Sequence, residues 1–198
     1  MSHALTYCIL DFEATCSEGS DEHEVIEFPS VIVDPETMAI WPQTFQCFVK
    51  PKHDPKVTPF CHKLTGITQE QVDGGITFPE ALKKHEKFLS IFPAPIYIIT
   101  CGDWDLRTMM PIECSNWKIK PSGQYTRWIN IKKEFSRFYQ LEGSHDMVKM
   151  LEHLKLPLIG RHHSGIDDCG NIARIVVKML EDGWTPGVSV YKPKISSD

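Results

Sequence analysis

The stretch Tyr7-Cys8-Ile9-Leu10-Asp11-Phe12-Glu13 joins an apolar run directly to two carboxylates that lie two residues apart. On a β-strand, residues i and i+2 point to the same face, so we expect Asp11 and Glu13 to converge on one side. Two like charges held that close repel each other and raise each other's pKa values. A divalent cation between them would relieve this repulsion, whereas exposed acids in a strand-end turn are the simpler alternative.

A second segment far downstream, His163-Ser164-Gly165-Ile166-Asp167-Asp168, places a histidine five residues before a carboxylate. Histidine accepts a proton near neutral pH, and the carboxylate is a further ligand for a hard cation. Asp105 adds an acid just past an apolar run, where the active-site groups of α/β sheets gather. Each residue alone has an ordinary explanation, as a helix-start acid or a surface histidine. Together they indicate an oxygen-rich cation site with a nearby base, which suits phosphodiester hydrolysis.

Length and composition are typical of one globular domain, with 198 residues, 41% hydrophobic and 24% charged. No apolar run approaches the roughly 20 residues that span a bilayer, and the N-terminus lacks a secretory pattern, so no membrane partner is expected. Seven cysteines without a C-x-x-C pair argue against a zinc ribbon or disulfide scaffold and predict an intracellular protein, cytoplasmic or nuclear. The net charge of −5 disfavours binding of nucleic acid through a global positive field.

Hydrophobic periodicity predicts an α/β alternation. Strands are expected at Tyr7 to Asp11, Phe28 to Asp34, Ile40 to Val49 and Ile96 to Cys101, the first three as an antiparallel meander. We expect a single domain over residues 1–187 and a loose tail over residues 188–198.

Helix-start signals predict where the helices begin. Thr68 and Thr77 each open a capping box, and the second leads into a helix that ends near Phe88. Further helices are expected from Asn130 through Tyr139, from about His145 to Leu154, and from near Asp168 to a stop at Gly183.

The chemistry-bearing residues resemble those of a known family. Asp11-x-Glu13, Asp105 and His163-x-x-x-x-Asp168 match the motifs of the DEDDh three-prime exonucleases, which have a ribonuclease H-like fold. The similarity is closer to the Eri-type RNA exonucleases, the group of the histone-mRNA three-prime exonuclease and the prion-interactor exonuclease. The strings that carry it are LDFEATC at 10–16, EFP at 27–29, LTGIT at 64–68, WIN at 128–130 and GIDDCGNIA at 165–173.

The resemblance implies a ribonuclease H-like α/β domain, with a mixed five-stranded sheet flanked by helices and the acids at one sheet edge. It implies that two Mg²⁺ or Mn²⁺ ions are held and that His163 is the general base. The implied activity is 3'-to-5' removal of nucleoside 5'-monophosphates from the single-stranded 3' end of RNA. The implied metal ligands are Asp11, Glu13, Asp105 and Asp168.

Neighbouring residues compete at three of these positions. His162 stands where relatives often carry proline, so two adjacent histidines are candidates for the base. The five-residue spacing to Asp168 favours His163, and it also selects Asp168 over the acid before it. Asp103 competes with Asp105, which the Trp-Asp pair of the family favours.

The resemblance also implies substrate contacts. Phe60, Leu64 and Trp104 would line the pocket for the terminal base, because apolar faces stack on any base with about 1–3 kcal/mol per base. Core packing is the alternative for Leu64. Ala14 and Thr15 would contact the terminal ribose, where a 2'-hydroxyl is sensed.

A dense basic stretch interleaved with Trp128 and Phe135 either tracks a phosphate backbone or is a solvated helix face. It contains Lys118, Lys120, Arg127, Lys132, Lys133 and Arg137.

Three other functions stay open from the residues. The same chemistry would serve a DNA-directed 3' exonuclease. A catalytically silent module would keep the fold and bind nucleic acid or recruit a partner. A cysteine hydrolase with Cys101 as nucleophile is the third, although nothing marks that thiol as activated.

Overall fold

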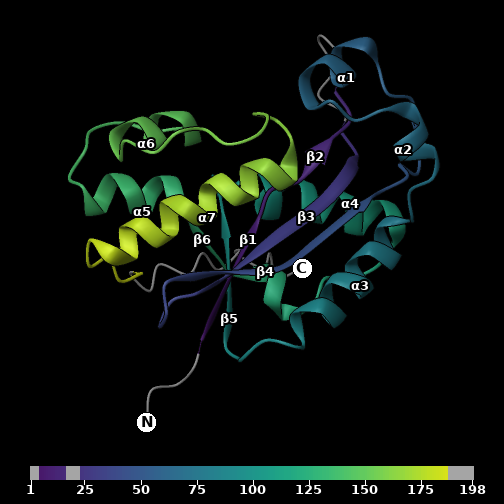
Figure 1. The fold of residues 1–198 in the computed structure, drawn as a ribbon. Coiled ribbons are helices and arrows are strands. Elements are labelled where there is room, and N and C mark those ends of the chain that lie inside the picture. Colours follow the sequence, from purple (N-terminus) through teal and green to yellow (C-terminus); the bar gives the residue numbers. More distant parts are fainter. Residues whose placement is uncertain (1–4, 17–22, 187–198) are drawn as a thin grey trace, which may run out of the picture.

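The computed structural model describes residues 5–16 and 23–186. Its centre is a mixed sheet with helices on both faces (Figure 1), which confirms the expected α/β class. The strand order is β2-β3-β1-β5-β6, and β4 pairs with β3. The strands are β1 Thr6–Leu10, β2 Glu13–Ala14, β3 Val25–Asp34, β4 Ala39–Phe48, β5 Ile96–Thr100 and β6 Trp128–Asn130.

The sheet has six strands, one more than expected. β2 and β6 are two and three residues long, which is too short for an alternating pattern to appear. The expected antiparallel meander is present, because β3 runs antiparallel to both β1 and β4. β5 runs parallel to β1 and to β6, so the carboxyl ends of these strands meet at one edge of the sheet.

Helices cover the two faces unequally (Figure 1). α5, α6 and α7 lie over one face, α3 and α4 over the other, and α1 and α2 extend beyond β2. The helices are α1 Pro59–Thr65, α2 Gln69–Asp73, α3 Phe78–Leu89, the π-helical turn η1 Asp105–Met109, α4 Met110–Trp117, the 3-10 turn η2 Gly123–Thr126, α5 Ile131–Phe138, α6 Met147–His153 and α7 Gly165–Glu181.

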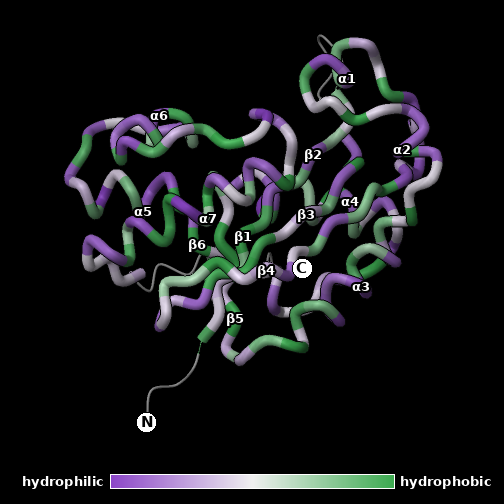
Figure 2. The backbone as a smooth tube through the Cα atoms, in the orientation of Figure 1, coloured by the Kyte–Doolittle hydropathy of each residue, from purple (hydrophilic) through white to green (hydrophobic). Residues whose placement is uncertain are grey.

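β1 is buried on both faces, which explains its unbroken apolar run (Figure 2). Cys8 and Leu10 pack with the α3 and α4 layer, whereas Tyr7 and Ile9 pack with the α7 layer. Each large apolar side chain buried in this way contributes about 1.5–3 kcal/mol to folding. The core therefore fixes β1 firmly just before Asp11.

The capping predictions are confirmed at three helices. Thr68 and Thr77 form capping boxes, and the Asn130 side chain accepts from the backbone N–H of Lys133. α7 begins at Gly165 rather than near Asp168, because the Gly165 N–H donates to the buried carboxylate of Glu27 in β3. Local sequence carries no sign of that acceptor.

Within residues 5–16 and 23–186, no helix combines the length and apolar character needed to cross a bilayer. All seven cysteines are free thiols, and four of them are buried. The tail expected at residues 188–198 lies outside the described residues.

Candidate active site

Four carboxylates converge at the carboxyl edge of the sheet. Asp11 follows β1, Glu13 begins β2, Asp105 opens η1 after β5, and Asp168 lies in the first turn of α7. Oxygen atoms of Asp11, Glu13 and Asp168 all lie within 4.8 Å of one another. The Phe12 backbone N–H donates to Asp105 Oδ1 at 2.8 Å, which holds the fourth carboxylate beside them.

Burial and mutual repulsion raise the pKa of each member of this cluster. Burial is the main cause of the raised Asp11 pKa, and the charges of Asp105 and Glu13 add to it. Burial raises the Glu13 pKa to about 9, with a further contribution from Glu27. Burial raises the Asp105 pKa to about 6, and it raises the pKa of Asp168 as well. The carboxylates therefore favour a bound positive charge.

The donor set fits a hard divalent cation. The grouped atoms are all carboxylate oxygens, the ligands that Mg²⁺ and Mn²⁺ prefer. Three of the four acids are at most 9% exposed, so ionising them without a cation is costly. The burial and grouping of these carboxylates therefore favour a site for Mg²⁺ or Mn²⁺ over a surface turn with exposed acids.

The two adjacent histidines occupy different places. His163 lines the cavity beside the acids, and its backbone N–H donates to Asp168 Oδ2 at 2.9 Å. Its pKa is lowered by partial burial and by the neighbouring His162, which keeps the imidazole neutral near pH 7. His162 instead has its Nδ1 atom 3.1 Å from Asp168 Oδ2.

The competing acids serve structural contacts. Asp103 accepts from Trp128 Nε1, Asn130 Nδ2 and Lys133 Nζ, which ties the segment after β5 to β6 and α5. Asp167 Oδ2 accepts from the backbone N–H of Arg161. Both are engaged away from the carboxylate cluster.

A cavity of about 260 Å³ opens beside the carboxylates. Ala14, Thr15, Leu64 and Trp104 line it, whereas Phe60 is not among its lining residues. Trp104 is 41% exposed, so its ring is accessible for stacking. The lining residues are Asp11, Phe12, Glu13, Ala14, Thr15, Cys16, His23, Leu64, Thr65, Trp104 and His163.

The Thr15 backbone N–H is already used, because it donates to the Glu24 carbonyl at 2.8 Å. The Thr15 hydroxyl oxygen accepts from the Glu24 N–H at 2.9 Å, which leaves the hydroxyl hydrogen as a donor. A ribose contact from Thr15 would therefore come from its hydroxyl group.

His23 is a cavity residue that sequence reasoning missed. Its ring meets the Trp104 ring edge-on, with 6.1 Å between centroids, and its Nδ1 atom lies 2.7 Å from the Thr15 carbonyl oxygen. No local pattern marks His23, because the ring that it meets, Trp104, comes from a segment distant in the sequence.

Glu27 is the second residue that was missed. It pairs across the sheet with Glu13, accepts from Gln46 Nε2 at 2.7 Å, and accepts from the Gly165 N–H at 3.2 Å. Burial raises its pKa. Glu27 thus fixes the first turn of α7, which carries Asp168.

The basic stretch does not form an aromatic platform. Trp128 and Phe135 are buried in the core, so neither ring is available to stack on a base. Lys133 pairs with Asp103, and Arg137 pairs with Glu134. Apart from Lys132, whose charge lowers the Asp11 pKa, this segment is better explained as a solvated helix face.

Cys101 has no sign of activation. Burial raises the pKa of its thiol well above the usual range, and the nearby acid Asp11 raises it further. A protonated thiol is a poor nucleophile, which disfavours the cysteine-hydrolase alternative.

Known proteins are similar to this chain in sequence and in fold. The family profile described as exonuclease matches residues 8–176. The chain is 42% identical over 184 residues to 3'-5' exoribonuclease 1 of Mus musculus, covering 89% of this chain and 53% of that protein. ERI1 exoribonuclease 3 of Bos taurus is 37% identical over 184 residues, covering 90% and 54% respectively. The chain thus spans about half the length of the curated relatives it matches.

A solved structure matches over almost its whole length. It is the nuclease domain of 3'hExo, a DEDDh family member, bound to rAMP. It has a TM-score of 0.89 and 39% sequence identity, covering 96% of this chain and 98% of that one. The cluster of acids, the fold around it and these matches agree: the chain belongs to the exonuclease family and, within it, to the DEDDh group.

Proposed function

We propose that this chain is a metal-dependent 3'-to-5' exoribonuclease that releases nucleoside 5'-monophosphates. The observation that carries the proposal is the convergence of Asp11, Glu13, Asp105 and Asp168 beside a cavity with His163 on its wall. The relatives named as exoribonucleases support RNA as the substrate.

The four carboxylates would hold two Mg²⁺ or Mn²⁺ ions. When bound, such ions acidify a water ligand and neutralise charge on the scissile phosphate. Asp105 is oriented for this role by the Phe12 N–H, and Asp168 by the His163 N–H. These bonds fix the carboxylates before any ion arrives.

His163 would accept the proton of the attacking water. The imidazole is exposed to solvent on the cavity side, and its lowered pKa keeps it in the basic form at neutral pH. Trp104 and Leu64, which line the cavity, would hold the terminal base, while Ala14 and Thr15 would contact the sugar. Phe60, which is 42% exposed one helical turn before Leu64, would contact a base only outside the cavity.

The test uses 5'-labelled single-stranded RNA with Mn²⁺ or with chelator. We expect a ladder that shortens from the 3' end, only with metal, and no shortening when the 3' end is blocked. Asp168→Asn should remove activity, whereas the matched variant Asp167→Asn should keep it, because the asparagine oxygen can still accept from Arg161. Degradation of the blocked RNA would refute exonuclease action.

The same assay separates the two alternative functions. DNA of the same sequence, shortened faster than RNA, would indicate a DNA-directed enzyme. Binding of RNA without shortening at any metal concentration would indicate a silent module.

A further inference from the structure

A second group of metal-ligating side chains shares one residue with the carboxylate cluster. It consists of His162, His163 and Asp168, whose ligand atoms lie within 4.8 Å of one another. The proposed function uses two of these residues and leaves His162 without a role. The group therefore calls for its own explanation.

The loop before α7 brings the three side chains together. The two imidazole rings stack with 3.9 Å between centroids and 20° between planes. The backbone at His163 has a φ of +66°, a left-handed conformation that is strained for a non-glycine residue. The bond from its N–H to Asp168 Oδ2 holds the loop in this conformation.

The donor atoms of this group differ in kind from those of the carboxylate cluster. Two imidazole nitrogens and one carboxylate oxygen suit Zn²⁺, whereas oxygen-only groups suit Mg²⁺ and Mn²⁺. We propose that His162, His163 and Asp168 form a Zn²⁺ site, with the remaining coordination position open to water.

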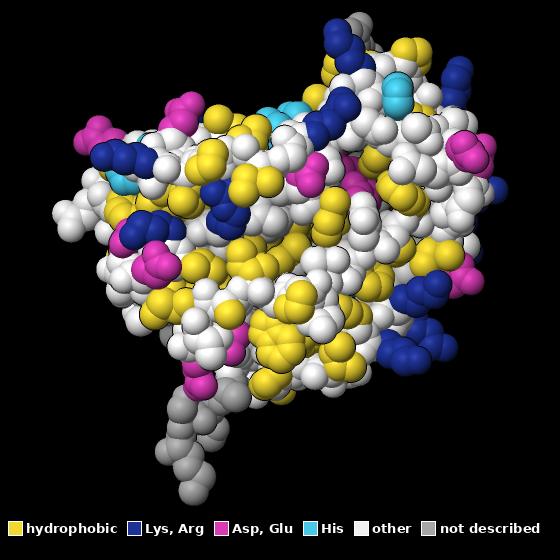
Figure 3. Space-filling model, viewed as in Figure 1, with side chains coloured by type: hydrophobic (Ala, Val, Ile, Leu, Met, Phe, Trp, Pro, Cys, Tyr) yellow, Lys and Arg dark blue, Asp and Glu magenta, His cyan; other side chains and the backbone are white. Residues whose placement is uncertain are grey.

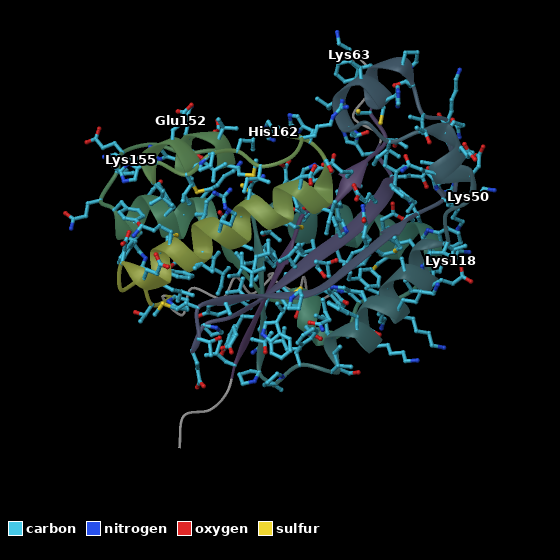
Figure 4. The ribbon with its side chains drawn as sticks, viewed as in Figure 1. Lys50, Lys63, Lys118, Glu152, Lys155 and His162 are labelled. Atoms are coloured by element: carbon cyan, nitrogen blue, oxygen red, sulfur yellow. The ribbon has the colours of Figure 1, made fainter. Side chains whose placement is uncertain are left out.

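The site is accessible on its outer side. His162 lies in the loop between α6 and α7, at the surface near the start of α7 (Figure 4), and its side chain is 39% exposed. Figure 3 shows histidine side chains at this upper rim, with acidic side chains nearby. Asp168 is the fixed ligand, at 5% exposure, while the two solvent-facing rings can turn to bring an ion into their planes.

Zinc at this site would oppose catalysis. Asp168 belongs to both groups, so zinc bound there competes with Mg²⁺ or Mn²⁺ for the same carboxylate. It also occupies the imidazole nitrogen of the proposed base. This inhibitory consequence rests on the proposed function, whereas zinc binding itself does not.

The experiment measures Zn²⁺ and Mn²⁺ binding to the untagged, metal-free chain by calorimetry. The variants are His162→Ala, Asp11→Asn, and the control His53→Ala, which removes an exposed histidine from the loop between β4 and α1. We expect His162→Ala to weaken zinc binding by at least the roughly 10–100-fold that loss of a supporting ligand contact costs. Asp11→Asn should keep zinc binding and lose Mn²⁺ binding, and His53→Ala should match the wild type in both.

Co²⁺ provides a readout independent of activity, because nitrogen ligation in a low-coordinate site gives strong visible bands. These bands should appear in the wild type and in Asp11→Asn, and disappear in His162→Ala that is folded by circular dichroism. Zinc binding unchanged in His162→Ala, or lost in Asp11→Asn, would overturn the proposal. Zinc binding that follows His162 in a chain without exonuclease activity would instead count against the proposed function alone.

Discussion

Two groups of buried polar side chains lie close to β1, and they have opposite electrostatic character. Beneath the strand, His85 lies 2.8 Å from both Ser30 Oγ and Tyr125 Oη, and all three residues are at most 1% exposed. At the end of the strand, Asp11 and its neighbours are acids that repel one another. The first group is neutral and its hydrogen bonds are made, whereas the acids of the second repel one another and the charge of Lys132 offsets only part of the rise in the Asp11 pKa.

The difference shows which group serves the fold and which serves the reaction. Burial lowers the His85 pKa to about 3, so this ring stays neutral and its hydrogen bonds persist across the physiological range. The acids have pKa values shifted upward, which means that folding opposes their ionisation. Repulsion between the acids lowers the stability of the metal-free protein, and binding of a cation raises that stability again.

The largest effect is expected for Asp11→Asn. Exonuclease activity should fall by about 1,000-fold, because the metal contributes several kcal/mol and each 1.4 kcal/mol or so is tenfold in rate. The metal-free protein should melt at a higher temperature, since one repelling charge is gone. RNA turnover and thermal melts measure the two results. A variant that is inactive and also less stable than the wild type would contradict the repulsion account.

His85→Ala should have the reverse profile. It leaves Ser30 and Tyr125 without their partner and creates a cavity, so the free energy of unfolding should fall by about 3 kcal/mol. Activity per folded molecule should stay at the wild-type level, because His85 is not among the residues that line the cavity. Urea denaturation gives the stability, with Tyr125→Phe as the milder control. A loss of turnover in fully folded His85→Ala would contradict the claim that His85 serves the fold and not the reaction.

His163→Ala should lower the rate by about 100-fold, the lower end of what general base catalysis contributes. The wild-type rate should decline as pH drops through the His163 pKa, which lies below the ordinary histidine value of about 6.5. This acidic limb should vanish in the variant. A pH–rate profile that keeps the limb in His163→Ala would move the base role elsewhere.

Trp104→Ala should have the smallest effect. Losing one stacking face costs about 1–3 kcal/mol, which should appear in KM for RNA rather than in metal binding. Trp104→Phe retains an aromatic face and should recover most of the loss. An unchanged KM in Trp104→Ala would place the terminal base elsewhere.

The sequence predicts the local features well, but it predicts only part of the site that tertiary contacts bring together. The capping boxes at Thr68 and Thr77 and the antiparallel strands follow from short-range patterns that the structure confirms. The expected start of α7 near Asp168 is wrong, because the carboxylate that accepts from the Gly165 N–H belongs to Glu27, 138 residues earlier.

The surroundings of the site depend on tertiary contacts that no local pattern reveals. The β2–β3 pairing sets Glu27 opposite Glu13, and the segment before β3 brings His23 into ring contact with Trp104, which follows β5. The pattern of the basic stretch leaves a nucleic-acid track and a solvated helix face open, and only the structure shows that its aromatic residues belong to β6 and α5 and are buried in the core.

The central claim, that repelling buried acids form a cation site, is tested most directly by melting temperature against pH with and without Mn²⁺. The folded acids bind protons more tightly than the unfolded chain does, because pKa values such as that of Glu13, about 9, are raised. Stability of the metal-free protein should therefore fall as pH rises from about 5 to about 8. Mn²⁺ should restore it, most strongly at the higher pH, and Asp11→Asn should respond little. A melting temperature that is flat with pH and unmoved by Mn²⁺ would contradict the account.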